Sequence, residues 1–305
     1  MLNLLQTSGE LGLICSLTVL ALFLSYRMLN VCDLSTPGWF TGGGGVGAAG
    51  ALWGHPALSL AAAMGAGICS GFVTATLQTR CGINSLLAGI IVNTGLYSVN
   101  IAVMGGASLL NMNKTETVFT AMKALLADTA LDSQYKLLTA LLFSAAAVTL
   151  LLLFLRTRLG LAIRATGNNA DMVRSSSINP AFTTTVGLCV SNSLTALSGC
   201  LLAQSQKSVD INLGGGMVTI ALASLLIGAT LFKKGGMTLQ AVGAVVGAIL
   251  FRVIYALALR CRLPAFMLRL VSAVIVALAL ALPYLRSQLS LWKRMRQQKG
   301  GESHA

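Results

Sequence analysis

The chain has 305 residues, of which 55% are hydrophobic and 10% are charged, and its mean hydropathy is +0.80. Soluble domains carry about a quarter charged residues, so the composition excludes a water-exposed globule. The net charge of +13 does not indicate nucleic-acid binding, because the cations cluster in short loops and at the C-terminus, where they set membrane topology. We therefore expect an all-α, polytopic transmembrane helical bundle.

The apolar segments predict about eight or nine membrane segments, because a bilayer core about 30 Å thick takes roughly 20 apolar residues per helix. Uncharged stretches such as 81–113 and 175–206 support this count. In chain order the segments are 9–29, 43–53, 57–79, 84–105, 137–155, 181–205, 217–232, 237–258 and 264–285.

The segment 43–53 consists mostly of Gly and Ala and is too short to span a bilayer. We expect it to be re-entrant or half of a broken helix, which is tolerated at membrane depth only where protein or a watery cavity covers the backbone. With a re-entrant segment here, the N-terminus is expected inside, and the first apolar run is expected to be retained because it lacks signal-peptide features.

The distribution of Lys and Arg predicts the orientation. The loop 156–174 carries four arginines and one aspartate, and the tail after 286 is also basic, so both belong in the cytoplasm. The segments 106–136 and 206–216 then lie outside. We expect one permease domain over 1–290, with a cytoplasmic coupling loop at 156–180, and a basic cytoplasmic tail over 291–305.

Small residues four positions apart predict close helix packing, because glycine lets two backbones approach in lipid. The chain has four such pairs. They are Gly43 and Gly47, Gly50 and Gly54, Gly67 and Gly71, and Gly243 and Gly247.

The polar loop 156–180 is predicted to hold two short helices. Gly167 is expected to be the joint between them, and Asn168 or Asn169 is expected to cap the second helix. Asn179 followed by Pro180 marks the start of the next span, since Asn is a good N-cap and Pro suits the first helical position.

Such a loop is a candidate docking element. Ile163, Met172 and Val173 offer an apolar anchor to a partner, while Arg164 and Arg174 offer charge. The alternative is a basic loop that only satisfies the positive-inside rule.

The stretch "GLAIRATGNNADMVRSSSIN" resembles the cytoplasmic loop of ABC-importer permeases of the branched-chain amino acid and ribose type. In that family the loop forms coupling helices that sit in a cleft of the ATPase subunit. The residues expected to couple to the ATPase are Gly160, Ala162, Ile163, Arg164, Ala165, Gly167, Asn169, Met172 and Arg174.

Further stretches extend the resemblance over roughly 34 to 285, including "GWFTGGGGVGAAGAL" and "GGGMVTIALASLLIGATLF". The chain looks closest to the subgroup of tryptophan/tyrosine permeases. It departs from the family at Ser177, where Gly is usual, and at Ala229, where an acidic residue is common. The resemblance implies a type II importer fold in a bacterial inner membrane. It also implies two ATPase copies, a second permease copy, and a periplasmic or lipoprotein binding protein, with membrane lipid around the bundle.

The sequence contains no sign of an energy source or a catalytic centre. A phosphate-binding loop of the form G-x-x-x-x-G-K-[ST] is absent, so ATP hydrolysis is expected in a separate subunit and the chain is not expected to be an enzyme. The seven cysteines show no metal-ligand spacing, and those within apolar segments are expected to act as small hydrophobes. No cofactor and no metal are expected.

Polar stripes on two predicted helices are candidates for the translocation path. Asn93, Tyr97 and Asn100 are spaced for one face of a helix, and Ser191 and Thr195 share a similar stripe. The alternative for each is hydrogen bonding between helices, which is the commoner role for Ser and Thr. Arg252, a charge near the middle of a span, is a functional hypothesis by default.

These features together predict the permease subunit of an ATP-driven importer for a small solute. The resemblance implies an amino acid such as tryptophan or tyrosine, with branched-chain amino acids, sugars and nucleosides as alternatives. An ion-coupled secondary transporter is a second alternative. It is disfavoured because the sequence shows no matched second half and no acidic residue expected near the midplane.

Overall fold

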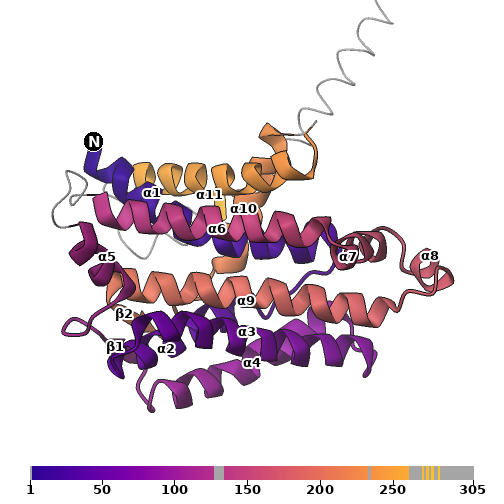
Figure 1. The fold of residues 1–305 in the computed structure, drawn as a ribbon, viewed down its shortest axis with the longest axis horizontal. Helices are drawn as coiled ribbons and strands as arrows, with labels where there is room; N and C mark the ends of the chain where they lie inside the picture. The colour runs from indigo at the N-terminus through magenta and orange to yellow at the C-terminus, as the bar shows by residue number, and fades with distance from the viewer. Residues whose placement is uncertain are drawn as a thin grey trace, which may run out of the picture.

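The computed structural model describes residues 2–126, 134–232 and 235–260, with residues 270, 273–274, 276–277 and 281. Its helices lie side by side along one axis, with β1 and β2 near one end and α7 and α8 at the other (Figure 1). Six helices are long and apolar enough to cross a membrane. They are α1 (Leu2–Leu22) continued by the π-helix η1 (Phe23–Met28), α3 (Pro56–Thr79), α4 (Ser85–Val103), α6 (Tyr135–Arg156), α9 (Pro180–Gln206) and α11 (Met237–Arg260).

The remaining elements are shorter, and the all-α polytopic bundle is confirmed apart from one two-stranded ribbon. The predicted span 264–285 is described only at the few positions given above, and the basic tail 291–305 lies outside the described residues. The shorter elements are α2 (Thr36–Leu52), β1 (Leu109–Asn111), α5 (Val118–Leu126), α7 (Arg158–Asn168), α8 (Ala170–Ser175), β2 (Ser208–Asp210) and α10 (Met217–Leu231).

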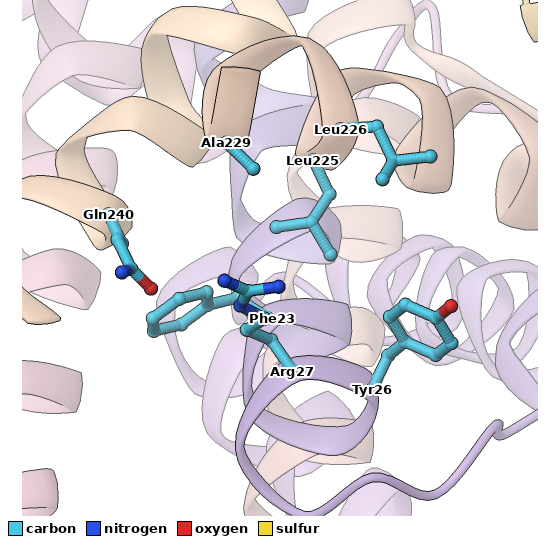
Figure 2. Close-up of a pocket in the computed structure, with 7 residues that line it drawn as sticks. All are labelled: Phe23, Tyr26, Arg27, Leu225, Leu226, Ala229 and Gln240. Carbon is cyan, nitrogen blue, oxygen red and sulfur yellow. The ribbon is translucent and has the colours of Figure 1, made fainter. Parts of the chain in front are cut away.

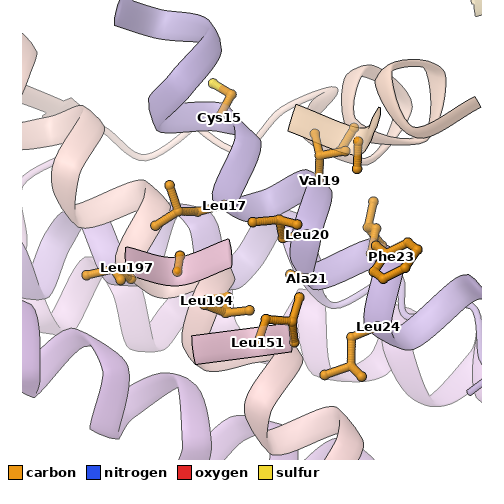
Figure 3. Packing of buried hydrophobic residues seen from close by; sticks show 14 of the residues in the cluster. Cys15, Leu17, Val19, Leu20, Ala21, Phe23, Leu24, Leu151, Leu194 and Leu197 are labelled. Carbon is orange, nitrogen blue, oxygen red and sulfur yellow. The ribbon is translucent and has the colours of Figure 1, made fainter. Parts of the chain in front are cut away.

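Two helices form the centre of the bundle. Of the 18 residues in the most apolar stretch of each helix, 83% are buried in α9 and 78% in the α1–η1 span, against 22% in α4 at the perimeter. Helices that are apolar on all sides are expected in a core. Figure 3 shows leucines of the α1–η1 span packed against leucines of α6 and α9. Those labelled are Leu17, Leu20 and Leu24 of the α1–η1 span, Leu151 of α6, and Leu194 and Leu197 of α9.

Glycines let the helices around α9 approach it closely, as the small-residue pairs predict. A Cβ on Gly43 would meet the backbone of Ala196, and a Cβ on Gly199 would meet the carbonyl oxygen of Phe40. On α3, a Cβ on Gly67 would lie 2.5 Å from the carbonyl oxygen of Asn192. The exception is Gly54, which has a φ of +84° in the turn after α2 and open space around it.

The expected position of the N-terminus is wrong. A Cβ on Gly9 would contact the side chain of Leu137, so the start of α1 lies beside the start of α6, while α6 ends at the coupling loop. Figure 1 shows the N-terminus at the end of the bundle opposite α7 and α8. The prediction failed because the segment 43–53 was taken to be re-entrant. Whether this segment enters and leaves on one side decides on which side of the membrane the N-terminus lies.

The segment 43–53 is the second half of a continuous helix, α2, that begins at Thr36. Its 17 residues span about 25 Å at 1.5 Å per residue, which is shorter than a bilayer core. It starts inside the bundle, because a Cβ on Gly89 would lie 2.7 Å from the amide nitrogen of Leu34 and one on Gly214 would meet Pro37. The segment is therefore not re-entrant, although most of the non-helical residues 29–35 before it are buried or half-buried, with Asn30 exposed. Such backbone is tolerated at membrane depth only where protein or a watery cavity covers it.

The two predicted outer loops meet at one end of the molecule. β1 pairs antiparallel with β2, with Leu110 opposite Val209, which joins 106–136 to 206–216. This end lies opposite α7 and α8 (Figure 1). The structure thus agrees with the expectation that these segments and the loop 156–174 are on different sides.

Candidate functional site

The coupling loop folds into two helices, as predicted. Thr157 begins α7 by accepting a hydrogen bond on Oγ1 from the amide of Gly160 at 3.2 Å. Asn169 begins α8, because its Oδ1 accepts from the amides of Asp171 and Met172, each at 3.1 Å. An N-cap side chain satisfies amides that have no partner within their own helix. The two helices are therefore defined by their own capping residues.

The joint between the helices lies at Asn169, and the prediction of Gly167 is wrong. Asn169 has extended backbone angles, whereas Gly167 lies inside α7. A Cβ on Gly167 would meet the carbonyl oxygen of Met28 and the backbone of Leu29. Glycine is needed here because α7 packs directly on the chain that follows η1.

The predicted apolar anchor also needs correction. Ile163 is 0% exposed and Val173 is 3% exposed, so both pack within this chain and neither is available to a partner. They were assigned to a partner because a helical sequence pattern identifies an apolar face without identifying what covers it. Their burial instead fixes the loop to the bundle.

The surface that the loop exposes combines cations with apolar side chains, among them Arg158, Leu161 and Met172. Met172 is 66% exposed and lies beside exposed Arg174, while Ala165 is exposed on α7. Gly160 is buried against the end of α6, and Ala162 and Arg164 are half-buried. Among the expected coupling residues, those exposed to a partner are therefore Ala165, Asn169, Met172 and Arg174, with Ala162 and Arg164 partly so.

The loop is also joined to the central helix. Thr166 on α7 and Thr183 on α9 share a hydrogen bond of 2.8 Å, and both side chains are buried. α9 starts as predicted, with Asn179 Oδ1 accepting from the amide of Ala181 at 2.9 Å and Pro180 in the first turn. A displacement of α7 would therefore be passed to the helix around which the bundle packs.

The candidate path residues on α4 lie on two different sides of the helix. Asn100 is buried and donates from Nδ2 to the carbonyl oxygen of Gly38 at 2.9 Å. Asn93 is half-buried and also faces α2, since a Cβ on Gly38 would lie 2.9 Å from Asn93 Oδ1. Tyr97 is 52% exposed on the outer surface of α4. The two asparagines thus lie together, and Tyr97 lies apart from them.

The candidate residues on α9 make hydrogen bonds within the bundle. Ser191 Oγ donates to the carbonyl oxygen of Ala21 on α1 at 2.8 Å. Thr195 Oγ1 donates to the carbonyl oxygen of Ser191 at 3.2 Å. Both side chains are buried, so they face a solute only in a state in which α1 and α9 have separated.

Arg252, a candidate functional charge, lies between α11 and α1. Its Nη2 donates to Cys15 Sγ at 2.9 Å, while its buried Nε has no partner among the described residues. This contact joins two packed helices and gives no indication of a solute site.

Asp33 is the polar residue that sequence reasoning missed, because it lies between the predicted apolar segments 9–29 and 43–53, where a membrane edge is expected. It is 1% exposed, and its Oδ1 accepts from Ser35 N at 2.8 Å and from Ser35 Oγ at 2.6 Å. Asn192 on α9 lies beside this carboxylate, and its Nδ2 donates to Ser35 Oγ at 3.5 Å. Asp33 therefore supports the start of α2 within the bundle. The lack of an acidic residue inside the bundle is then no longer an argument against an ion-coupled secondary transporter.

Replacing Asp33 with Ala is expected to destabilise the protein by about 1–3 kcal/mol, since Ser35 would lose its buried acceptor. Asp33→Asn keeps an acceptor oxygen and is expected to retain most of the stability. The measurement is the apparent melting temperature of the two purified variants in one detergent. Equal melting temperatures for Asp33→Ala and the unaltered protein would show that α2 does not depend on this contact.

Comparison with known proteins agrees with this architecture. The family described as branched-chain amino acid transport system / permease component matches residues 8–283, and the chain belongs to that family. Its members are multi-pass permease components of ABC-type transport systems rather than enzymes, and they work with ATPase subunits.

Two curated relatives cover most of the chain. The tyrosine transport system permease protein of Clostridioides difficile is 31% identical over 271 residues, which are 88% of each chain. An uncharacterized protein of Rickettsia prowazekii is 31% identical over 231 residues, which are 76% of this chain and 79% of the relative. No solved structure matches the chain significantly.

Proposed function

We propose that this chain forms the translocation path of an ABC importer for an aromatic amino acid such as tyrosine, in a bacterial inner membrane. The observation that carries the coupling role is the loop α7–α8. Its inner face is locked into the bundle by Ile163 and Val173, and its outer face presents Ala165 and Met172. A loop with only a topological role needs charge but no such rigid support.

The ATPase is proposed to contact the exposed residues of α7 and α8, with Met172 as the apolar contact and Arg174 as the charged one. The buried residues Gly160 and Ile163 and the half-buried Gly167 act by holding these helices in place. Closure of the ATPases would then push α7, and the bond between Thr166 and Thr183 would transmit that push to α9.

The assembly is proposed to contain two ATPase copies, a second copy of this chain, and a binding protein. The binding protein would dock at the opposite end, where β1, β2 and α5 lie (Figure 1). This placement puts the cation-rich loop in the cytoplasm, as the positive-inside rule favours. The proposed tyrosine specificity is supported by the likeness to the tyrosine transport system permease protein of Clostridioides difficile.

The path is proposed to run along the side of α4 that faces α2, where Asn93 and Asn100 lie. Amides in an apolar environment are costly unless they are paired, so the half-buried amide of Asn93, close to the buried and paired Asn100, supports a place where a polar solute can cross. Tyr97 lies outside this face and would reach the solute only at an interface with a second copy. Ser191 and Thr195 would join the path when α1 and α9 separate.

Replacing Asn93 with Leu is expected to reduce uptake about tenfold without lowering membrane abundance, because no hydrogen bond joins its half-buried side chain to the described part of the chain. Asn100→Leu is the comparison variant. Its loss removes a buried hydrogen bond to the Gly38 carbonyl oxygen, worth about 0.5–1.5 kcal/mol, so it is expected to lower abundance. Uptake and immunoblot intensity are measured in parallel. Equal loss of abundance in both variants would assign Asn93 to packing.

The direct test of the proposed function is uptake of radiolabelled L-tyrosine into proteoliposomes that contain this chain, its ATPase and its binding protein. We expect uptake that requires ATP inside the vesicles and that excess unlabelled tyrosine or tryptophan competes away. Competition only by leucine, ribose or a nucleoside would assign the transporter to that substrate class instead. Uptake driven by an ion gradient without ATP would contradict the proposal and support a secondary transporter.

A further inference from the structure

A pocket lies between η1 and the pair α10 and α11, on the side of the bundle away from α4 (Figure 1). Figure 2 shows the guanidinium of Arg27 between the ring of Phe23 and the side chain of Leu225, with Gln240 at the other edge. Leu226, Ala229 and Tyr26 complete the lining. The pocket thus combines apolar walls with one permanent positive charge.

The pocket offers a hydrogen-bond donor, the guanidinium of Arg27, and an acceptor, the side-chain oxygen of Gln240. None of the described lining residues is acidic, so the charge of Arg27 is not neutralised within the pocket. Gln240 uses its Nε2 to donate to the carbonyl oxygen of Gly235 at 3.1 Å. Its Oε1 is turned toward Phe23 and the pocket in Figure 2. An anion that also carries a hydrogen-bond donor would therefore satisfy both side chains.

The position of Arg27 corresponds to the headgroup level of a bilayer. Arg27 lies in the last turn of the apolar span Leu5–Met28, and Met28 contacts α7. The apolar surface beside the pocket continues onto α11, where Leu239 and Val242 are exposed. Basic pockets between membrane helices on the cytoplasmic side bind lipid headgroups, because phosphate pairs with Arg while the chains follow the apolar surface.

We propose that this pocket binds a phospholipid of the cytoplasmic leaflet. The phosphate lies on Arg27, a donor of the headgroup (an ammonium or a hydroxyl) lies on Gln240 Oε1, and an acyl chain lies along α10 and α11. The assignment to the cytoplasmic leaflet rests on the orientation proposed above, whereas binding itself does not. A bound lipid would hold η1 against α10 at the end where α7 is attached.

The test is native mass spectrometry of the purified full chain, titrated with phosphatidylethanolamine, phosphatidylglycerol or phosphatidylcholine. The first two have headgroup donors and are expected to bind more tightly than phosphatidylcholine, which has none. Arg27→Gln is expected to weaken binding of both donor lipids about tenfold. Ala229→Glu is expected to do the same, because a carboxylate in the lining competes for Arg27 and repels phosphate.

The matched control is Arg80→Gln, which removes an exposed cation at the end of α3, outside the pocket. It is expected to leave lipid affinity unchanged. Gln240→Met is expected to abolish the preference over phosphatidylcholine while phosphatidylcholine itself binds as before. These readouts do not depend on transport, so they remain valid if the substrate is not tyrosine.

Several results would overturn the proposal. One is equal lipid affinity for Arg27→Gln and the unaltered protein, and another is equal weakening by Arg80→Gln, which would indicate a diffuse charge effect. Displacement of the lipid by glycerophosphoethanolamine at the same concentration would indicate a headgroup-only anion site. Displacement by L-tyrosine would identify a solute site instead.

Discussion

Glutamates at both Ala165 and Met172 are expected to abolish ATP-driven uptake while the protein still folds. Both residues are exposed in this chain, and surface substitutions usually change stability by no more than about 0.5 kcal/mol. At a docked ATPase the same changes would bury two unpaired charges in place of small apolar contacts. A penalty of about 3 kcal/mol, typical of an interface hot spot, corresponds to a loss of roughly a hundredfold in affinity.

The measurement is recovery of the ATPase with the tagged permease from detergent, together with uptake in proteoliposomes. Leu125→Glu is the matched control, because Leu125 is an equally exposed apolar residue on α5 at the opposite end of the bundle. It is expected to retain the ATPase. Full recovery of the ATPase with the double variant would show that α7 and α8 do not form the docking surface.

Replacing Gly199 with Leu is expected to remove the folded protein from the membrane. A Cβ at this position would coincide with the carbonyl oxygen of Phe40, so α2 and α9 cannot keep their separation with any side chain here. Adding methylene groups to a well-packed core destabilises a protein by about 1–3 kcal/mol. The destabilisation by a clash with the backbone is larger, because the backbone cannot move to another rotamer as a side chain can. Total stability is only about 5–15 kcal/mol.

The measurement is membrane abundance and the monodisperse fraction in size-exclusion chromatography. Gly65→Ala is the control, since a Cβ on Gly65 meets nothing within 4 Å and Ala favours a helix by up to about 1 kcal/mol over Gly. It is expected to be neutral or stabilising. Wild-type abundance for Gly199→Leu would mean that α2 and α9 do not pack as described.

Local signals in the sequence predicted the two helices of the loop 156–180 well, because these helices are defined by their own residues. Asn169 and Asn179 cap helices through bonds to amides within a few positions, which a spacing argument can identify. What covers each side of those helices depends on contacts across the chain. Ile163 and Gly167 were therefore given partner-facing or hinge roles, although they pack on this chain's own backbone and core.

Long-range packing also explains the errors around α2. The helix begins with Thr36, Pro37 and Gly38, which carry little apolar signal, and it persists because the bundle covers it. Asp33 looked like an edge residue for the same reason, since a short polar stretch normally lies at a membrane surface. Its burial follows from the contacts of residues 29–35 with α4 and α9, and these pairings are not visible in a single sequence.

The central claim, that a separate ATPase drives this permease through the loop α7–α8, is tested most directly by photo-crosslinking in native membranes. A benzoylphenylalanine is placed at position 172 on α8 or, as the comparison, at position 125 on α5. We expect a crosslink to the ATPase from position 172 and none from position 125. A crosslink to the ATPase from position 125, with none from position 172, would contradict it.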